Sequence, residues 1–469
     1  MIRDSPSLVQ GARKIETEND EKTMETTTKE LKTKHMFLNM GPAHPAMHGI
    51  IKIVLELDGE TVINADIDIG YLHRCFEKHC ENGNYMQAIP YTDRLNYVSP
   101  LINNVGYVMA VEKLFGIEVP KRCQYIRVIM SEISRITDHL TCIGATAMEL
   151  GAMTVFLYMM KAREYLYDLI EDVSGARITT SYTRIGGVKT DLPDDFKEKC
   201  REALKELRSV LEEVHRLLTK NRIFVDRMRG VGKISQEFAQ SYGITGPFLR
   251  STGIGYDVRK ANPYLIYDSV EFKIPTGIEG DNLDRYLVRM EEMEQSSRII
   301  EQALRDIPEG SVRVDLLDRI IESSEMIDLA KMGKTKELIL THSKVAPTLE
   351  GSEVQSHFRI NVDKRTIVIP SKQDTYSNIE GLMNHFMLIM YKDGIRAPEG
   401  EVYFPVEGAN GELGFYIVSN GTDRPHRVRV RPPCFPIMAA FHEIIQGDMV
   451  ADIIPTFGSV NMIGGELDR

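Results

Sequence analysis

The residues best suited to chemistry near neutral pH lie in a short loop, GPAHPAMHG, at residues 41–49. Two prolines and a closing glycine restrict its backbone and hold the imidazoles of His44 and His48 at its tip. Because imidazole changes protonation near neutral pH, a rigid pair of this kind suits proton delivery or metal binding. The alternative is that both rings only hydrogen-bond the turn, and the spacing alone leaves the two open.

A second cluster of possible ligands occurs in the segment YLHRCFEKHC, residues 71–80. On a helix, Cys75 and His79 would share one face and could supply two metal ligands. Zinc takes four ligands, or three and a water molecule, and the sequence offers no complementary Cys/His pair elsewhere. We therefore expect an ordinary helix here, with Leu72 and Phe76 facing the core.

Glu149 is the only charged residue in an apolar segment that spans residues 140–160. The length of this segment would permit a membrane-spanning helix. The central carboxylate, several small residues and the lack of a second such segment favour a helix buried in a soluble bundle. A buried carboxylate needs a partner. That partner is either an arginine such as Arg127 or Arg135, or a catalytic histidine that Glu149 would orient.

Composition argues against several functional classes. With 57 Lys and Arg against 68 Asp and Glu, the net charge of −11 argues against a general nucleic-acid binder. The six cysteines form no CxxC motif, which argues against the usual iron–sulfur and structural zinc spacings. Nucleotide binding is not expected, because the sequence has no Walker loop and no helix-opening GxGxxG motif. The alternating arginines at residues 424–431 favour a solvated face or a contact between subunits over phosphate binding.

The elements that must position these residues follow from hydropathy periodicity. Residues 1–35 are polar and predict a disordered extension. Alternation around Asp58-Gly59 predicts a β-hairpin within a β region at 36–70. Helical periodicity predicts a core at 71–306, with helices at 71–81, 101–114, 124–160 (broken once), 196–218 and 283–304. Residues 400–469 suggest a β-rich end and a tail. The predicted fold class is α+β around a central helix bundle.

Nine segments, taken in order along the chain, carry a family resemblance. They are LNMGPAHPAMHG, IGYLHRCFEK, PYTDRLNYVS, AVEKLFGIEVP, ELGAMTVF, SGARITTSYTRIGGV, GITGPFLR, YDVRKANPY and GGELDR. The sequence resembles the family of the D subunit of NADH-quinone oxidoreductase, the 49 kDa-type subunit of respiratory complex I. That family is related to the large subunit of nickel–iron hydrogenases. The resemblance implies a hydrogenase-large-subunit-like domain at residues 36–469, with a probable insertion at 309–359.

The resemblance also implies a quinone site. By position in the motifs, His48 is expected to hydrogen-bond the quinone head group with His44 nearby, and Tyr97 to bond the opposite carbonyl. Glu149, which replaces the family's usual aspartate, is expected to pair with His48. An imidazole and a phenol can each donate a hydrogen bond to a carbonyl and then a proton as negative charge develops. His48, Tyr97 and Glu149 are thus the expected catalytic residues.

Two further positions are expected near the partner's iron–sulfur cluster: Arg74, and Thr179, which stands where many members carry histidine. The equivalents of the hydrogenase nickel ligands also depart from the hydrogenase pattern, since they fall at Asn96, Ser99, Ile463 and Glu466. With no thiolate among them, nickel cannot be held and hydrogenase activity is excluded.

The function implied is that of a peripheral-arm component in a proton-translocating NADH:quinone oxidoreductase. It would line the quinone cavity with the neighbouring B subunit and receive electrons from the terminal iron–sulfur cluster of that neighbour. The chain is expected to bind no cofactor or metal of its own, with FMN and iron–sulfur clusters on partner subunits. The B, C and membrane-arm H subunits are its expected neighbours. The expected location is the cytoplasmic side of the cell (inner) membrane, without a transmembrane segment.

Two alternatives stay open. The same quinone-site component could serve a complex fed by ferredoxin or a reduced deazaflavin instead of NADH. A purely structural scaffold with a degenerate hydrogenase pocket is the other, although His48, Tyr97 and Glu149 are all present in this sequence.

Overall fold

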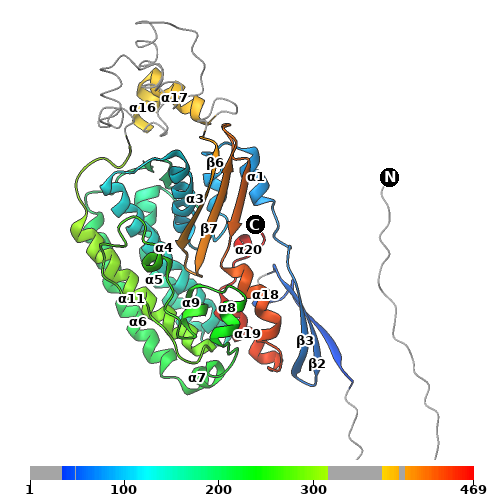
Figure 1. Cartoon of the computed structure of the whole chain (residues 1–469). Helices are drawn as coiled ribbons and strands as arrows, with labels where there is room; N and C mark the ends of the chain where they lie inside the picture. Colours follow the sequence, from blue (N-terminus) through cyan, green and yellow to red (C-terminus); the bar gives the residue numbers. More distant parts are fainter. Residues whose placement is uncertain (1–33, 48, 315–371, 390–396) are drawn as a thin grey trace, which may run out of the picture. The chain divides into compact units, whose positions relative to one another are not determined.

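Four long helices pack side by side and form the helical core (Figure 1). They are α4 (Lys121–Glu149), α5 (Met153–Ser174), α6 (Phe196–Val214) and α11 (Asn282–Asp306). The computed structural model describes residues 34–47, 49–314, 372–389 and 397–469. The predicted apolar face of α4, with Ile129, Ile133 and Ile136, is fully buried. A sustained 3.6-residue period therefore predicted this bundle correctly.

The break expected in the long apolar segment is present. Helix α4 ends at Glu149 and α5 begins at Met153. Between them, Gly151 adopts a φ of +88°, a left-handed conformation that favours glycine. The apolar segment at residues 140–160 is thus the end of one bundle helix and the start of the next. In the described part of the chain, no helix combines the length and the apolar character that a membrane span requires.

The predicted N-terminal hairpin is confirmed as part of a three-stranded antiparallel sheet. Its strands are β1 (Met36–Met40), β2 (Lys52–Asp58) and β3 (Thr61–Asp68), in the order β1-β2-β3. Ile53, Leu55 and Leu57 alternate along β2 and are buried. This face packs on helix α18 (Cys434–Ile444) in a second core cluster.

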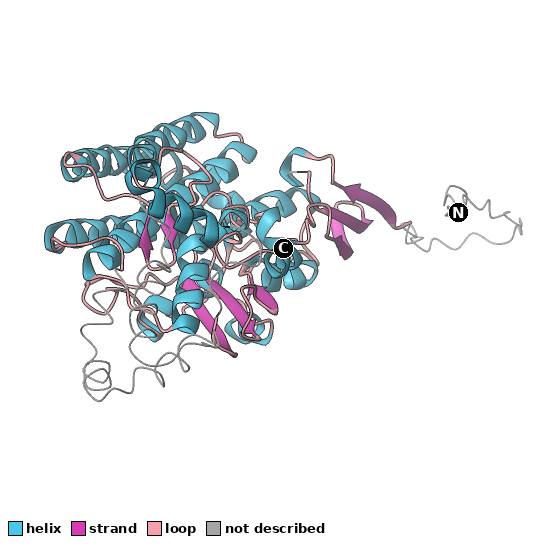
Figure 2. Ribbon diagram, turned by 90° about the horizontal axis from the view of Figure 1, so that it is seen from above, coloured by secondary structure: helices cyan, strands magenta, loops and turns pink. Residues whose placement is uncertain are grey.

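A second antiparallel sheet consists of β6 (Gly400–Glu407), β7 (Glu412–Ser419) and β8 (Arg427–Arg431). Seen from above, it lies against helices of the core (Figure 2). Helix α3 (Pro100–Phe115) approaches it closely. A Cβ at Gly106 would lie 2.8 Å from a methyl carbon of Val406 and 3.0 Å from the ring of Phe415, so this contact requires glycine.

The C-terminal part differs from the prediction after Arg431. Residues 434–467 form α18, α19 (Val450–Val460) and α20 (Gly464–Leu467) instead of further strands. In α18, Ile437, Phe441 and Ile444 follow a helical period and are buried. The prolines of this region suggested β punctuation, but Pro433 caps α18, a position that proline tolerates.

The remaining elements are short, and several of them lie between α6 and α11 along the chain. They are η1 (Pro45–Met47), α1 (Phe76–Asn82), α2 (Ile89–Thr92), β4 (Thr183–Arg184), β5 (Gly187–Val188), η2 (His215–Thr219), α7 (Arg222–Met228), α8 (Gln236–Ser241), α9 (Gly246–Arg250), α10 (Val258–Ala261), α16 (Lys372–Ser377) and α17 (Ile379–Ile389). The predicted extension at 1–35 and the predicted insertion at 309–359 lie almost entirely outside the described residues.

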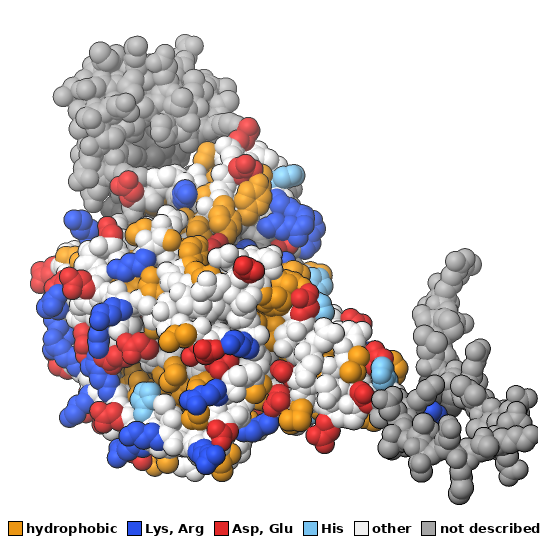
Figure 3. Space-filling model, turned by 60° about the horizontal axis from the view of Figure 1, so that its bottom comes forward, with side chains coloured by type: hydrophobic (Ala, Val, Ile, Leu, Met, Phe, Trp, Pro, Cys, Tyr) orange, Lys and Arg blue, Asp and Glu red, His pale blue; other side chains and the backbone are white. Residues whose placement is uncertain are grey.

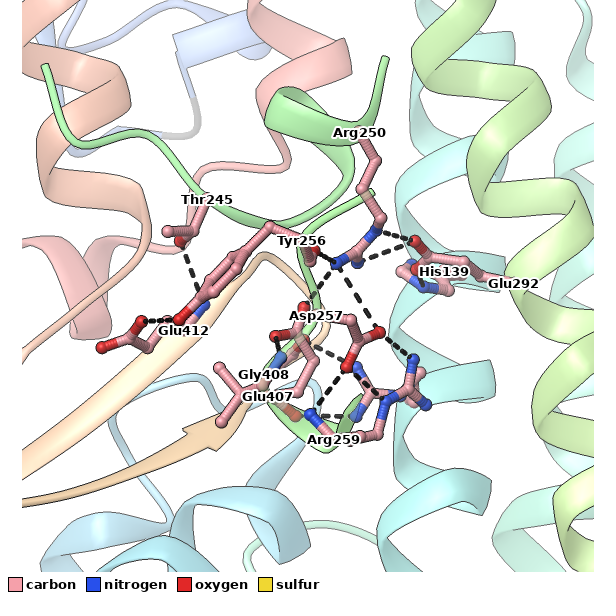
Figure 4. A network of polar contacts seen from close by, with 12 residues as sticks. His139, Thr245, Arg250, Tyr256, Asp257, Arg259, Glu292, Glu407, Gly408 and Glu412 are labelled. Carbon is pink, nitrogen blue, oxygen red and sulfur yellow. Dashed lines mark hydrogen bonds and ion pairs between the residues drawn. The ribbon is translucent and has the colours of Figure 1, made fainter. Parts of the chain in front are cut away.

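A buried ionic network joins the core helices to β6 (Figure 4). Glu132 of α4 accepts hydrogen bonds from Arg135 (3.2 Å) and Arg259 (3.1 Å). Arg250 contacts Glu292 of α11 at 2.7 Å and Glu407 of β6 at 2.8 Å. All of these side chains are buried, so the network fixes α4, which also carries the polar residues described next.

On the face that Figure 3 shows, Lys and Arg side chains are interspersed with Asp and Glu side chains. Among the described residues, partly exposed ion pairs include Arg208 with Glu294 at 3.0 Å and Arg177 with Asp168 at 3.0 Å. The part of this face that the described residues form shows no extended basic patch.

Candidate functional site

A buried carboxylate on α4, Asp138, lies at the centre of a polar pocket. One of its oxygens accepts hydrogen bonds from the Asn96 amide (2.8 Å) and the Ser99 hydroxyl (2.7 Å). The other accepts the Asn461 amide at 2.6 Å. Asp138 is fully buried, and all three donors are neutral. The pocket therefore joins α4 to the segment before α3 and to the segment before α20.

Glu466 closes the same pocket from α20. Only 2% of this residue is exposed, and its carboxyl accepts the backbone N–H of Cys434 at 3.1 Å. Burial raises the pKa of Glu466 to about 7, and nearby Asp138 contributes to the rise. The resemblance placed Asn96, Ser99 and Glu466 at positions of hydrogenase ligands, and the structure brings them together around Asp138. Among the described residues, no group of three or more His, Cys, Asp or Glu side chains could hold a metal ion.

Tyr97 lies at the edge of this pocket. Its exposure is 37%, and its hydroxyl makes no hydrogen bond to another described residue. Burial raises the pKa of Tyr97 above its usual value near 10; Asp138 adds to this rise and Arg74 opposes it. The phenol is therefore protonated at neutral pH and available as a hydrogen-bond donor.

Arg74 approaches from the segment before α1. Its guanidinium donates to the backbone carbonyl of Arg94 at 2.7 Å and remains exposed. Asp93, which precedes Arg94 in the chain, is fully buried, and its carboxylate accepts the backbone N–H of Ser181 at 3.0 Å. Thr179 precedes this contact by two residues and has a φ of 55°. The structure thus brings Arg74 and the loop of Thr179 to one segment, the residues just before Tyr97.

The loop at residues 41–49 is described except for His48, which lies outside the described residues. The Nδ1 atom of His44 accepts the backbone N–H of Ala46 at 3.2 Å, so this ring does hydrogen-bond the turn. Met47 is fully buried, and η1 packs against α19. The loop is therefore anchored on the C-terminal helices.

Glu149 ends α4 beside the same helix. A Cβ at Gly458 of α19 would lie 3.1 Å from a carboxyl oxygen of Glu149, which shows how closely this carboxylate approaches α19. Neither arginine suggested as its partner is available. Arg127 pairs with Glu112 at 2.6 Å, and Arg135 pairs with Glu132 at 3.2 Å. These two arginines are therefore engaged by other carboxylates, and both an arginine partner for Glu149 and its pairing with His48 stay predictions.

The suggested metal-ligating face of residues 71–80 does not form. Helix α1 begins at Phe76, because Cys75 adopts a φ of 55°. Cys75 consequently precedes the helix instead of sharing a face with His79. His73 contacts the backbone carbonyl of Asp468 at 3.0 Å, and the ring of His79 lies 5.6 Å from that of Tyr91.

The alternating arginines of β8 are held within the chain. Arg427 pairs with Glu81 at 3.3 Å and Arg429 with Glu77 at 2.5 Å, so this strand is fastened to α1. Backbone bonding adds to the contact, since Val430 donates its N–H to Glu77 at 3.0 Å. The side chains of Arg427 and Arg429 are nevertheless 44% and 55% exposed and alternate with buried Val428 and Val430, so the expected solvated face is confirmed, and its arginines also pair with α1.

The closing GGELDR segment fastens the site together. The Asp468 carboxylate accepts the backbone N–H groups of Gly70 (3.0 Å) and Leu72 (2.8 Å). Gly465 packs directly on the segment before Tyr97. A Cβ at Gly465 would lie 2.3 Å from the carbonyl oxygen of Arg94 and 2.7 Å from that of Leu95.

Asp138 was not identified from the sequence as a site residue. A charged residue in a helix that is buried on all sides indicates a polar network, so its position in α4 could have pointed to it.

Replacing Gly465 with alanine is expected to displace this segment, because backbone oxygens cannot yield as flexible side chains do. We expect a destabilisation of about 1–3 kcal/mol, typical of overpacking. Chemical denaturation of the full chain measures it. Gly255→Ala is the matched control, since its nearest neighbour would be an ordinary contact at 3.7 Å. Equal denaturation midpoints for the two variants would contradict the close packing of Gly465.

Comparisons with known proteins agree with one another. The family model described as "Respiratory-chain NADH dehydrogenase, 49 Kd subunit" matches residues 149–469. A D subunit of NADH-quinone oxidoreductase from Sorangium cellulosum is 48% identical over 440 residues, which cover 94% of this chain and 97% of that protein. The D subunit of the same enzyme from Myxococcus xanthus is 48% identical over 94% of both chains. A C/D subunit of NADH-quinone oxidoreductase from Bdellovibrio bacteriovorus is 45% identical and matches 94% of this chain and 70% of its own length.

Proposed function

The chain belongs to the family of the 49 kDa subunit of respiratory-chain NADH dehydrogenase, and on that premise we propose that Tyr97 and the loop at 41–49 bind the head group of a quinone. As a member of this family it is a subunit of an oxidoreductase complex and has no independent activity. The proposed site would lie against the partner subunit that carries the terminal iron–sulfur cluster. Electrons would reach the quinone from that cluster.

The observation that supports this proposal best is the state of Tyr97. Its phenol is protonated at neutral pH, partly exposed and free of hydrogen bonds to other described residues. A quinone carbonyl accepts a hydrogen bond from such a group. When the quinone takes up two electrons, negative charge develops on its oxygens and the same phenol can donate a proton.

The opposite carbonyl would meet the loop at 41–49. Both this loop and Glu149 pack against α19. The loop contacts α19 through its short helix η1, and Glu149 lies beside Gly458 of α19. This shared helix supports a pairing of Glu149 with His48. A carboxylate there would fix the imidazole tautomer and favour its protonated form, which can then give up a proton to the quinone.

The electron donor, the neighbouring subunits and the location of the chain are also part of the proposal. The relatives described above are named as subunits of NADH-quinone oxidoreductase, which favours NADH over ferredoxin or a deazaflavin as the donor. The C/D protein of Bdellovibrio supports a C subunit as neighbour. We place the B and membrane-arm H subunits beside it as well, with FMN and the iron–sulfur clusters on partner subunits. The chain would be peripheral, on the cytoplasmic side of the membrane.

A photoreactive quinone analogue bound to the assembled membrane complex tests this site. We expect cross-linked peptides that contain Tyr97 or the loop at 41–49, and we expect excess unlabelled quinone to prevent the labelling. Arg74 and Thr179, proposed to lie near the partner's cluster, should be labelled less. Labelling that is confined to other subunits, or that excess quinone does not reduce, would contradict the proposal.

A further inference from the structure

Arg289 of α11 differs from the other buried arginines of the described chain because it has no polar partner there. Arg285 donates hydrogen bonds to four neutral oxygens, those of Asn282, Ser459, Gly232 and Gly280. The remaining buried arginines each contact a carboxylate at 3.2 Å or less; they are Arg127, Arg135, Arg250 and Arg259.

The guanidinium of Arg289 is buried without compensation. This residue is 2% exposed, yet it makes no hydrogen bond or ion pair with another described residue, and its Nε atom is buried without a partner. A buried cation is unfavourable unless it is paired or hydrogen-bonded. A group outside the described chain is therefore expected to compensate it.

Arg289 lines a small cavity where four helices meet. Asn282, Tyr286 and Arg289 follow at intervals of four and three residues on α11, so they share the face that borders the cavity. The other lining residues are Cys142, Ile143 and Thr146 of α4, Phe224 and Met228 of α7, and Ser459 of α19. None of these residues is Asp or Glu, so the only formal charge in the lining is that of Arg289.

The charge of Arg289 reaches the cavity wall. Burial raises the pKa of the Cys142 thiol to about 11, and Arg289 is the strongest influence that opposes this rise. Asp138 and Glu149 also act on Cys142, in the same direction as burial. Neither carboxylate lies within 4.0 Å of an Arg289 nitrogen, so neither pairs with the guanidinium.

The hydrogen-bond donors of the lining suit an anion. A guanidinium carries five N–H donors and no acceptor. The side-chain amide of Asn282 donates one hydrogen to the Thr456 hydroxyl at 3.0 Å and has a second hydrogen to donate. Ile143, Phe224 and Met228 form an apolar wall opposite these groups in composition. An anion would accept from both donors and also neutralise the cation, which a water molecule cannot do.

The size of the cavity selects a small ion. Its volume is about 10 Å³, which admits one particle of about the size of a water molecule. Phosphate, sulfate and carboxylate groups contain several heavy atoms and are too large. A halide ion is a single atom, and chloride is the common halide of biological solutions.

We propose that this cavity binds one chloride ion, held by the Arg289 guanidinium and the Asn282 amide. The ion compensates the buried charge and stabilises the packing of α11 against α4, α7 and α19. The inference does not rest on the quinone site, and it assigns the chain a bound inorganic anion with a structural role.

Chemical denaturation of the full chain over a range of chloride concentrations tests the inference. Potassium chloride replaces potassium gluconate at constant ionic strength, because gluconate is too large for the cavity. If the folded chain binds one ion that the unfolded chain does not, the equilibrium constant for unfolding should fall about tenfold between about 0.1 M and about 1 M chloride. A constant that does not respond to chloride would overturn the inference.

Arg289→Met removes the charge but keeps an unbranched apolar side chain, so this variant should lose the tenfold response. The matched control is Arg298→Met on the same helix, where the arginine side chain is 50% exposed and pairs with Glu294 at 3.2 Å. The control should keep the full response. A chloride response that persists in Arg289→Met would show that the ion acts elsewhere and would overturn the proposed site.

Bromide supplies a readout that is independent of stability, and it decides the question if Arg289→Met does not fold. Crystals of the wild-type full chain grown in bromide should give an anomalous peak within hydrogen-bond distance of the Arg289 guanidinium. The absence of a peak from this cavity would overturn the inference. Neither result bears on the labelling of Tyr97 by a quinone analogue, which tests the proposed function separately.

Discussion

Replacing Tyr97 with phenylalanine is expected to lower the quinone-reductase turnover of the assembled complex by about a hundredfold. The substitution removes one hydroxyl and keeps the ring, so packing is preserved. The lost hydroxyl is the group that would donate a hydrogen bond to the quinone and then a proton. Because this bond strengthens as charge develops, turnover should fall more than quinone affinity. Steady-state kinetics over a range of quinone concentrations measure both.

The control for this variant is Tyr91→Phe on α2. Tyr91 is 40% exposed against 37% for Tyr97, so the two substitutions remove hydroxyls from similarly exposed rings. We expect Tyr91→Phe to leave turnover within about twofold. Electron transfer to a water-soluble acceptor reports whether each complex is assembled. Unchanged activity of Tyr97→Phe at low quinone concentration would favour the alternative of a structural scaffold with a degenerate pocket.

The site was only partly predictable because its residues meet through contacts that are distant along the chain. Motif positions identified Tyr97 and Arg74, and the structure places both beside one pocket. Asp138 pairs with Asn461, which is 323 residues away, and no local period carries such information. The start of α1 was also missed, since the left-handed backbone of Cys75 has no signature in side-chain hydropathy.

The fold was more predictable than the site, for a physical reason. Hydrophobic residues recur every 3.6 residues in a helix and every two residues in a strand, because each element buries one face. Buried Ile133 of α4 and Leu55 of β2 belong to such patterns, which is why both elements could be predicted. Where a segment is buried on all sides, its polar residues instead contact each other across elements. Glu132 of α4 meets Arg259, 127 residues later, and this partnership appears only in three dimensions.

That buried network predicts the largest loss of stability on a single substitution. Three arginines, Arg135, Arg250 and Arg259, face four carboxyl groups, those of Glu132, Asp257, Glu292 and Glu407 (Figure 4). Although burial opposes it, Arg135 and Arg259 hold the pKa of Glu132 at about 2. Burial and neighbouring Asp257 raise the pKa of Glu407, whereas Arg250, Arg259 and Arg135 oppose this rise.

Arg250→Met keeps the length and the apolar stem of the side chain but removes its charge. Glu292 and Glu407 then lose a cation at 2.7 Å and 2.8 Å in a fully buried site. We expect the free energy of unfolding to fall by about 3–5 kcal/mol, the usual cost of an uncompensated buried charge. Urea denaturation of the full chain, with the slope held constant, measures the loss.

An arginine-to-methionine substitution at the protein surface is the control for Arg250→Met. It shows how much of the loss of stability comes from breaking an ion pair and how much from the burial of that pair. Arg298 of α11 pairs with Glu294 at 3.2 Å, but its side chain is 50% exposed. Because solvent screens this pair, Arg298→Met should cost about 1 kcal/mol or less. The network also sets the response to acid. The depressed pKa of Glu132 contributes stability that is full above its unfolded value near 4.5 and is lost as the pH falls toward 2. Similar losses for Arg250→Met and Arg298→Met at neutral pH would show that burial of the network does not determine its contribution, and the ionic bridge between α4, α11 and β6 would then have no special role in holding the site.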